Sequence, residues 1–267
     1  MGADIKSLRL RIKSVDSTLH LTRAMGLVAS SKIRRATEGM LRAREYGEAV
    51  ARTVKILSAS PECQRSPYMQ ERQGDRLRLI VIAGDRGLAG GYNANIFRLL
   101  RTLPKAEIIP IGKRASDRFG GETVRAEGYS FSAARQLAEE LCRDFLDGKY
   151  DRLGIVSTRY ESMMTQEARV DYILPLERQE GGKVSGTVFE PDEATVLNAA
   201  IPEYVAGLLI HAVRESFASE VAARRCAMDS AGKNAEEMIR ALELEYNRAR
   251  QGAITQEITE IVAGGSV

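Results

Sequence analysis

The sequence predicts a mixed α/β protein in which two long terminal helices form an antiparallel coiled coil and the middle of the chain forms an α/β domain. Three observations predict this fold class. Residues 5–57 and 218–256 place apolar or small residues at heptad spacing. No proline interrupts the chain before Pro61 or after Pro202. The middle alternates short β-branched runs with helical patterns.

The N-terminal segment predicts one continuous helix. Steps of three and four residues give a seam sustained for more than seven heptads, which corresponds to a helix of roughly 55 residues and roughly 80 Å. Small residues in the middle of this seam would let a partner helix approach closely. The seam consists of Ile5, Leu8, Ile12, Val15, Leu19, Thr22, Gly26, Ala29, Ile33, Ala36, Met40, Ala43, Gly47, Val50, Val54 and Leu57.

The C-terminal segment predicts a second helix, from about Glu203 to Val262, because no proline follows Pro202. Its similar length and its 3.5-residue spacing favour a left-handed antiparallel pair with the first helix. Toward the end the apolar positions shift to a different face, so the last turns are expected to project beyond the partner helix. These positions are Ile254, Ile258, Ile261 and Val262, whereas the seam itself consists of Ala218, Val221, Arg225, Met228, Gly232, Ala235, Ile239, Leu242, Tyr246, Ala249, Ala253 and Gln256.

The middle of the chain predicts a three-layer, Rossmann-like domain with a mainly parallel sheet. Strands are expected at 77–84, 106–112 and 152–159, with an edge strand at 170–176, and helices at 91–102, 113–119 and 132–147. Residues 177–186 are expected to form a flexible hairpin or connector. The predicted domains are an N-terminal coiled-coil helix at 1–60, an α/β domain at 61–200 and a C-terminal coiled-coil helix at 201–267.

Composition excludes several functional classes. The chain has 267 residues, 44% of them apolar, which is enough for a sizeable core. Cys63, Cys142 and Cys226 lie far apart, so no metal site or disulfide framework is predicted, and a reducing compartment fits best. Neither His20 nor His211 is assigned a catalytic role. The start resembles no signal peptide, and the apolar stretch 204–213 is too short to span a membrane.

Charge is distributed unevenly. Residues 1–57 contain twelve Lys and Arg against five Asp and Glu, whereas residues 203–267 contain seven against ten. The basic cluster would attract an acidic partner, either a nucleic acid or acidic protein loops, although an ordinary solvated face remains an equal alternative. This cluster consists of Lys32, Arg34, Arg35, Arg42 and Arg44.

A glycine-rich segment, GDRGLAGGYNANI (84–96), follows a strand and begins a helix, where such turns often bind phosphate. It matches neither standard nucleotide-binding motif, so the structural interpretation is favoured: the glycines form a tight turn, and Asn93 or Asn95 helps to start the helix. We find no catalytic triad, zinc motif or isolated carboxylate pair. The sequence therefore predicts no catalytic residues, no cofactor and no bound metal.

Three segments carry a resemblance to a known family. IKSLRLRIKSVDSTLHLTRAMGLVASSKIRRA near the start, GDRGLAGGYN in the middle and YNRARQGAITQEITEIVAG at the end closely resemble the γ subunit of the bacterial F-type ATP synthase. The likeness covers nearly the whole chain in the family's order. Departures are small: Gly26 replaces a charged or longer residue, Gly84 a serine and Ala89 a cysteine.

The resemblance implies a rotor shaft rather than an enzyme. It implies a coiled coil inserted through a ring of three α and three β subunits, and a foot bound with the ε subunit to the membrane c-ring. Rotation of the c-ring would then change the conformation of the catalytic β subunits and regulate proton flow. The resemblance also implies no nucleic-acid partner, and a peripheral location on the cytoplasmic face of the cell membrane, attached only through the c-ring.

The resemblance also implies individual contact residues. Arg250 and Gln251 match a pair that contacts a β-subunit catch loop, with Thr255 and Glu257 in the same region and Arg224 coupled to it. Met25 matches a methionine near an acidic β lever loop, with Lys32, Arg34 and Arg35 nearby. Phe189 and Glu190 match foot residues at the c-ring or ε contact, although Thr187 replaces a tyrosine there. The alternatives left open are a nucleotide-binding α/β enzyme that uses the glycine-rich turn, and a coiled-coil nucleic-acid-binding protein.

Overall fold

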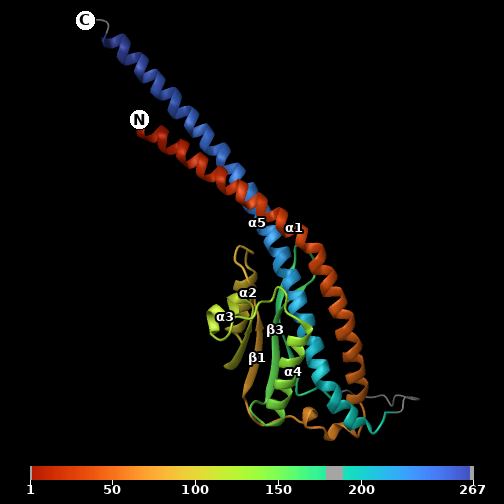
Figure 1. Ribbon diagram of the computed structural model, residues 1–267. Coiled ribbons are helices and arrows are strands. Elements are labelled where there is room, and N and C mark those ends of the chain that lie inside the picture. Colours follow the sequence, from red (N-terminus) through yellow and green to blue (C-terminus); the bar gives the residue numbers. More distant parts are fainter. Residues whose placement is uncertain (1, 179–188, 265–267) are drawn as a thin grey trace. The chain divides into compact units, whose positions relative to one another are not determined.

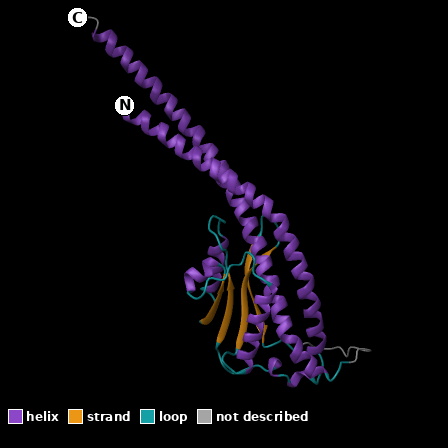
Figure 2. Cartoon of the chain, in the orientation of Figure 1, coloured by secondary structure: helices purple, strands orange, loops and turns teal. Residues whose placement is uncertain are grey.

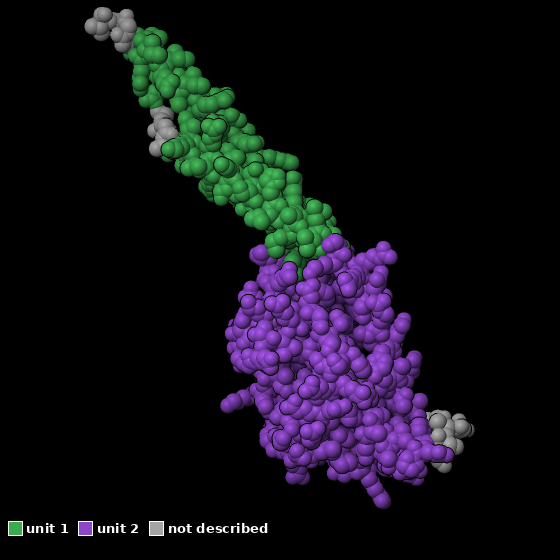
Figure 3. Space-filling view, in the orientation of Figure 1, with its two compact units in different colours: residues 1–30, 224–267 green, residues 31–223 purple. Residues whose placement is uncertain are grey.

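The computed structural model describes residues 2–178 and 189–264, so most of the expected connector at 177–186 lies outside the described residues. The chain divides into two compact units, coloured separately in Figure 3. Unit 1 contains residues 1–30 and 224–267, and unit 2 contains residues 31–223. Helix accounts for most of unit 1, whereas unit 2 also contains a sheet (Figure 2).

The first helix, α1, extends from Gly2 to Ser58 and confirms the predicted continuous helix. All sixteen seam positions are buried or half-buried. Ala29 is 3% exposed and Ala36 is 6% exposed, whereas Leu27, which lies outside the seam, is 69% exposed. The heptad pattern therefore identifies the buried face of α1 correctly in both units.

The last helix, α5, extends from Glu193 to Gly264, so the predicted start near residue 203 is wrong. Asp192 starts the helix instead, because its carboxylate accepts hydrogen bonds from the Thr195 N–H and hydroxyl, at 2.8 and 2.7 Å. These bonds lower the pKa of Asp192. Pro202 lies inside the helix, where it removes one backbone hydrogen bond. The fully buried Leu197, Ile201 and Val205 offset that loss by packing in the core.

The sheet of unit 2 has the strand order β2-β1-β3-β4. Strands β1 (Leu77–Ile82), β2 (Ala106–Ile111) and β3 (Arg152–Tyr160) are parallel, and β4 (Gln166–Leu174) pairs antiparallel with β3 at the edge. The connecting helices are α2 (Tyr92–Leu100), α3 (Lys113–Phe119) and α4 (Phe131–Leu146), with short 3-10 turns at Cys63–Arg65 and Pro67–Met69. The mainly parallel sheet is therefore confirmed.

Helices cover both faces of the sheet (Figure 1). Strand β1 is buried along its whole length and alternates between two cores. Ile80 and Ile82 face a core shared with α4, the C-terminal end of α1 and the first turns of α5. Leu79 and Val81 face a second core shared with α2. This arrangement confirms the predicted three layers, and it attaches α5 directly to the sheet.

Candidate functional sites on α1, α5 and the glycine-rich turn

In unit 1, α1 and α5 run antiparallel with glycines on both sides of the contact. Gly26 faces Met228, and Gly232 faces Thr22 and Leu19. These two contacts agree with an antiparallel register, because the four residues from Thr22 to Gly26 on α1 match the four residues from Gly232 back to Met228 on α5. Extrapolated at the helical rise, Ile5 lies opposite roughly residue 249, so the end of α5 outruns α1.

Arg225 is a polar member of the α5 seam. Its guanidinium donates hydrogen bonds to the Gly26 carbonyl, at 3.3 Å, and to the Ser30 hydroxyl. Because Gly26 and Gly232 carry no side chains, a cavity of about 410 Å³ remains beside this contact. Arg23 closes its edge through an ion pair with Glu236, at 2.7 Å. Hydrogen bonding by Arg225 thus takes the place of a large apolar seam residue at this point of the pair.

The tip of α5 is exposed beyond its pairing with α1. Ile254, Ile258, Ile261 and Val262 are 47%, 56%, 74% and 67% exposed, although they recur at helical spacing. Isolated exposed apolar residues are ordinary, whereas these four form a continuous apolar stripe on one helix. The structure therefore confirms the prediction that the last turns of α5 extend beyond α1.

The four predicted contact residues of the tip, Arg250, Gln251, Thr255 and Glu257, are all exposed on this segment. Among the described residues, the Arg250 and Gln251 side chains make no hydrogen bond or ion pair within the chain. The Thr255 hydroxyl donates to the Gln251 carbonyl, at 2.9 Å. The Arg250 guanidinium and the Gln251 amide are therefore presented to solvent, near the point where α5 extends beyond α1.

The other predicted shaft residues have different environments. Met25 and Arg224 are half-buried members of unit 1. In unit 2, Arg35 is exposed, and Arg34 pairs along its own helix with Glu38, at 2.9 Å. The Arg34 side chain is 88% exposed and remains open to a partner.

Lys32 is engaged within the chain, which sequence reasoning did not reveal. Its ammonium lies 2.5 Å from the carboxylate of Glu127, which also lies 3.7 Å from Arg86. The Asp85 carboxylate holds this loop in place by accepting hydrogen bonds from the N–H groups of Ala126 and Glu127, at 3.1 and 2.7 Å. An acidic partner must therefore compete with Glu127 for Lys32.

Phe189 and Glu190, the predicted foot contacts, lie just before α5. Phe189 is half-buried and packs against the larger core, and Glu190 is exposed. Thr187, the departure from the family pattern, lies outside the described residues. The Phe189 side chain therefore has a structural role of its own, whereas Glu190 is free to contact a partner.

The glycine-rich turn is organised from inside the chain. The Asp85 carboxylate accepts a hydrogen bond from the Lys113 N–H, at 3.1 Å, in addition to those from the 126–127 loop. It thereby anchors the start of the glycine-rich turn to α3 and to that loop. Asn93 does not cap α2 as expected. Its side-chain Oδ1 accepts a hydrogen bond from the Gly84 N–H, at 2.9 Å, and so ties the end of β1 to the helix. The residue before α2 is Gly91, which lacks a side-chain cap.

Comparisons with known proteins agree with this geometry. The family model described as ATP synthase matches residues 4–266. The ATP synthase gamma chain of Ruminococcus albus is 42% identical over 97% of this chain and 96% of its own. The chain belongs to the ATP synthase gamma-chain family. As a gamma chain it is a non-catalytic subunit of the central stalk, which excludes the alternative of a nucleotide-binding enzyme.

Other relatives extend the comparison. The gamma chain of Geotalea uraniireducens is 35% identical over 98% of both chains, and a sodium-ion-specific gamma chain of Acetobacterium woodii is also 35% identical. Among solved structures, a chain of the Euglena gracilis mitochondrial ATP synthase has a TM-score of 0.72 at 22% identity, covering 100% of this gamma chain and 97% of its own. That likeness establishes the fold of the gamma chain.

One stretch of α5 is long and apolar enough, by composition, to cross a membrane, and half of it is buried in the protein. Packing explains its apolarity, because this part of α5 contributes one wall of the larger core. These core residues of the gamma chain are Leu197, Ile201, Val205, Ala206, Leu209, Ile210, Ala212 and Val213. The gamma chain is associated with the membrane through the complex to which it belongs.

Proposed function

We propose that this gamma chain transmits rotation of a membrane c-ring to the catalytic β subunits mainly by steric displacement. In this proposal residues 1–60 and 201–267 form the shaft and residues 61–200 form the foot. The shaft turns inside a ring of three α and three β subunits and pushes the β levers through their conformations. The coupled flow of protons is regulated by the same rotation.

The exposed tip of α5 is the observation that carries this proposal. It presents an apolar stripe together with Arg250 and Gln251, which lack side-chain partners within the described chain. An exposed ion pair contributes only about 0–1 kcal/mol, so a few such pairs cannot supply the energy needed to reshape a nucleotide site. They can instead be broken and remade at each step. Arg250 and Gln251 therefore act as a detent, with Thr255, Glu257 and Arg224 supporting the same contact.

The remaining contacts of the proposal follow from exposure and charge. Arg34 and Arg35, next to Met25 and Lys32 in the sequence, meet an acidic loop of the β subunit. Glu190, beside Phe189, contacts the c-ring or the ε subunit. The protein then lies on the cytoplasmic face of the cell membrane, held there through the c-ring.

Single-molecule rotation of the assembled complex tests the mechanism. Arg250→Ala should weaken the coupling between hydrolysis and rotation while leaving most of the torque, because the helix still displaces the levers. Arg248→Ala is the matched control, since it removes another exposed arginine of the same helix. If Arg250→Ala abolished both torque and coupling while Arg248→Ala preserved them, the steric mechanism would be wrong.

The absence of a nucleic-acid partner stays a prediction with its own test. Binding of the basic α1 to DNA would show a steep dependence on salt concentration. We expect no such binding when the chain is assembled with α and β subunits. Salt-dependent retention of DNA by the assembled complex would contradict this prediction.

A further inference from the structure

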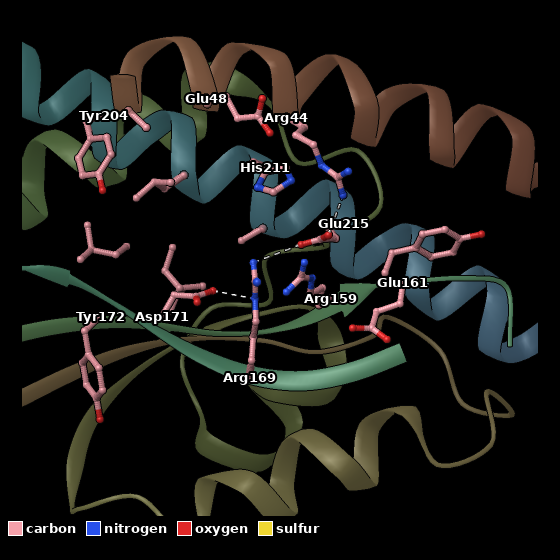
Figure 4. Close-up of a pocket in the computed structure, with 17 residues that line it drawn as sticks. Arg44, Glu48, Arg159, Glu161, Arg169, Asp171, Tyr172, Tyr204, His211 and Glu215 are labelled. Atoms are coloured by element: carbon pink, nitrogen blue, oxygen red, sulfur yellow. Dashed lines mark hydrogen bonds and ion pairs between the residues drawn. The ribbon is translucent and has the colours of Figure 1, made fainter. Parts of the chain in front are cut away.

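A cavity of about 730 Å³ in unit 2 has no role in the proposed function. It lies where α1 and α5 pass over the β3–β4 edge of the sheet. Figure 4 shows charged side chains of α1, of α5 and of the sheet around it. The cavity is open to solvent, since Glu48, Arg159 and Asp171 in its lining are exposed. Charges that are buried are normally paired, so the buried carboxylate at the wall of this cavity calls for a physical explanation.

Glu215 of α5 links these elements at the cavity wall. Its side chain is 2% exposed, and one carboxylate oxygen lies 3.1 Å from the Arg44 guanidinium of α1. The other oxygen lies 3.6 Å from the Arg169 guanidinium of β4, too far for a hydrogen bond. Arg169 pairs in turn with Asp171, at 2.9 Å. We call the trio Arg44, Glu215 and Arg169 the clamp.

His211 lies one helical turn before Glu215 on α5, so the two side chains share a face of the helix. Figure 4 shows the imidazole beside the Arg44–Glu215 pair, at the same cavity. The buried His211 Nε2 makes no hydrogen bond with the described residues, and neither does Glu215 Oε2, the oxygen that lies 3.6 Å from Arg169. His211 and Glu215 both line the cavity, so a nitrogen that can donate and an oxygen that can accept a hydrogen bond lie at the same site.

We propose that His211 is a proton-operated release for the clamp between α1, α5 and β4. When the imidazole gains a proton, its Nε2–H donates to the unfilled oxygen of Glu215, and its positive charge repels Arg44 and Arg169. Both guanidiniums then separate from Glu215, and α1 and β4 loosen from α5. The other charged groups that line the cavity are Glu48 on α1, Arg159 on β3, Glu161 and Asp171.

The sign of the effect follows from the environment of the imidazole. Burial lowers the pKa of His211; Arg44 and Arg169 lower it further, whereas Glu215 and Glu48 oppose the shift. The opened state therefore binds the proton more tightly than the closed state. The clamp is complete above the ordinary value of 6.5 and is lost as pH falls through 6.5 toward the lowered pKa.

Two measurements on the full chain test this inference without reference to the proposed function. The chain has two histidines, so proton NMR yields one imidazole signal from His211 and one from His20, assigned with His20→Gln. Hydrogen exchange, followed from about pH 7.5 to about pH 5.5, then reports opening near Arg44 and Arg169. After correction for intrinsic exchange, the opening equilibrium should rise by at most about tenfold per pH unit, in step with the His211 signal.

The matched variants are His211→Gln, which removes the titration but keeps a polar side chain, and His20→Gln, which removes the other histidine. We expect the pH-dependent opening to disappear in the first and to persist in the second. The inference is overturned if opening follows pH equally in His211→Gln, or if the His211 signal titrates above 6.5. Should His211→Gln fail to fold, the NMR titration of the native chain still decides.

Discussion

Gly26 of α1 faces Met228 of α5 so closely that a methyl group added at Gly26 would lie 3.6 Å from the Met228 Cβ. That distance is an ordinary van der Waals contact, so the space is available without displacement of α5. Glycine in a helix costs about 0.5–1 kcal/mol relative to alanine. The seam of unit 1 therefore contains a local weakness that packing does not require.

Gly26→Ala should raise the free energy of unfolding by up to about 1 kcal/mol, measured by denaturant unfolding of the full chain. Gly207→Ala is the matched control on α5 in unit 2, where α5 faces α1, because its new Cβ would lie 3.2 Å from the Tyr46 ring. We expect the control to gain less or to lose stability. Destabilisation by Gly26→Ala would show that the two helices pack more tightly there than these distances indicate.

The tip and the seam of α5 should respond differently to mutation. Leu242 is 5% exposed, so Leu242→Ala should cost about 2–5 kcal/mol of stability. Ile258 is 56% exposed, so Ile258→Ser should change the isolated chain by less than about 0.5 kcal/mol. In the assembled complex Ile258→Ser should reduce activity, because the proposed function places the apolar stripe against the α and β subunits. A large loss of stability in the isolated Ile258→Ser chain would contradict the exposed tip.

Substitution of two glycines in unit 2 can distinguish the stability cost of backbone strain from that of a steric conflict. Gly112 has a φ of 93°, and a Cβ there would lie 1.9 Å from the Ala83 carbonyl oxygen. Gly120 has a φ of 82° but open space around it. With a ψ of −173°, Gly120 lies in a backbone region that is essentially restricted to glycine, so Gly120→Ala should cost about 1–3 kcal/mol from backbone strain alone. Gly112→Ala should cost clearly more or prevent folding, and equal thermal midpoints for the two variants would contradict this distinction.

The parts of the fold that the sequence predicts are those set by local pattern. Heptad spacing identifies the buried face of α1 because each seam residue is itself apolar or small. The predicted start of α5 after Pro202 was wrong, because a proline was assumed to end the helix on its N-terminal side. The Asp192 cap and the packing of Ile201 decide where α5 begins. The Asp192-to-Thr195 spacing was the signal that could have located it.

The candidate site was predictable only in part. The exposed position of Arg250 follows from the heptad pattern, because the seam passes through Ala249 and Ala253 and leaves Arg250 on the outer face. The pairing of Lys32 with Glu127 joins residues 95 positions apart. It depends on backbone hydrogen bonds from a loop to Asp85, and no spacing in the sequence encodes them.

Lys32 and Glu127 make a prediction that separates internal from external contacts. Both side chains are 38% exposed, so their pairing should contribute less than about 1 kcal/mol to the stability of the isolated chain. A double-mutant cycle with Lys32→Gln and Glu127→Gln measures that value. In the assembled complex, Lys32→Gln should reduce activity while Glu127→Gln does not, because an acidic partner competes with Glu127 for the lysine. Equal losses in both variants would indicate that the internal pair alone matters.

Asp151 links the sheet to the segment before β1 and should make unit 2 sensitive to acid. Its carboxylate accepts hydrogen bonds from the Arg76 N–H and guanidinium, at 2.8–3.0 Å, and its side chain is 2% exposed. These bonds lower the pKa of Asp151 from its ordinary value of 3.8. The unfolded state therefore binds the proton more tightly, and the stability that Asp151 contributes is lost as pH falls through 3.8 toward the lowered pKa.

Asp151→Asn should lower stability at neutral pH and flatten its decline in acid, followed as the urea midpoint between about pH 6 and about pH 3. Asp229→Asn is the control, because Lys233 also lowers the pKa of Asp229 but the Asp229 side chain is 50% exposed. Salt should screen the exposed Asp229 pair and leave the buried Asp151 contacts largely intact. An unchanged acid slope in Asp151→Asn would mean that other carboxylates control the acid unfolding of unit 2. The partly buried Asp144, whose pKa Lys149 and Arg78 lower through hydrogen bonds, would then be the next residue to replace.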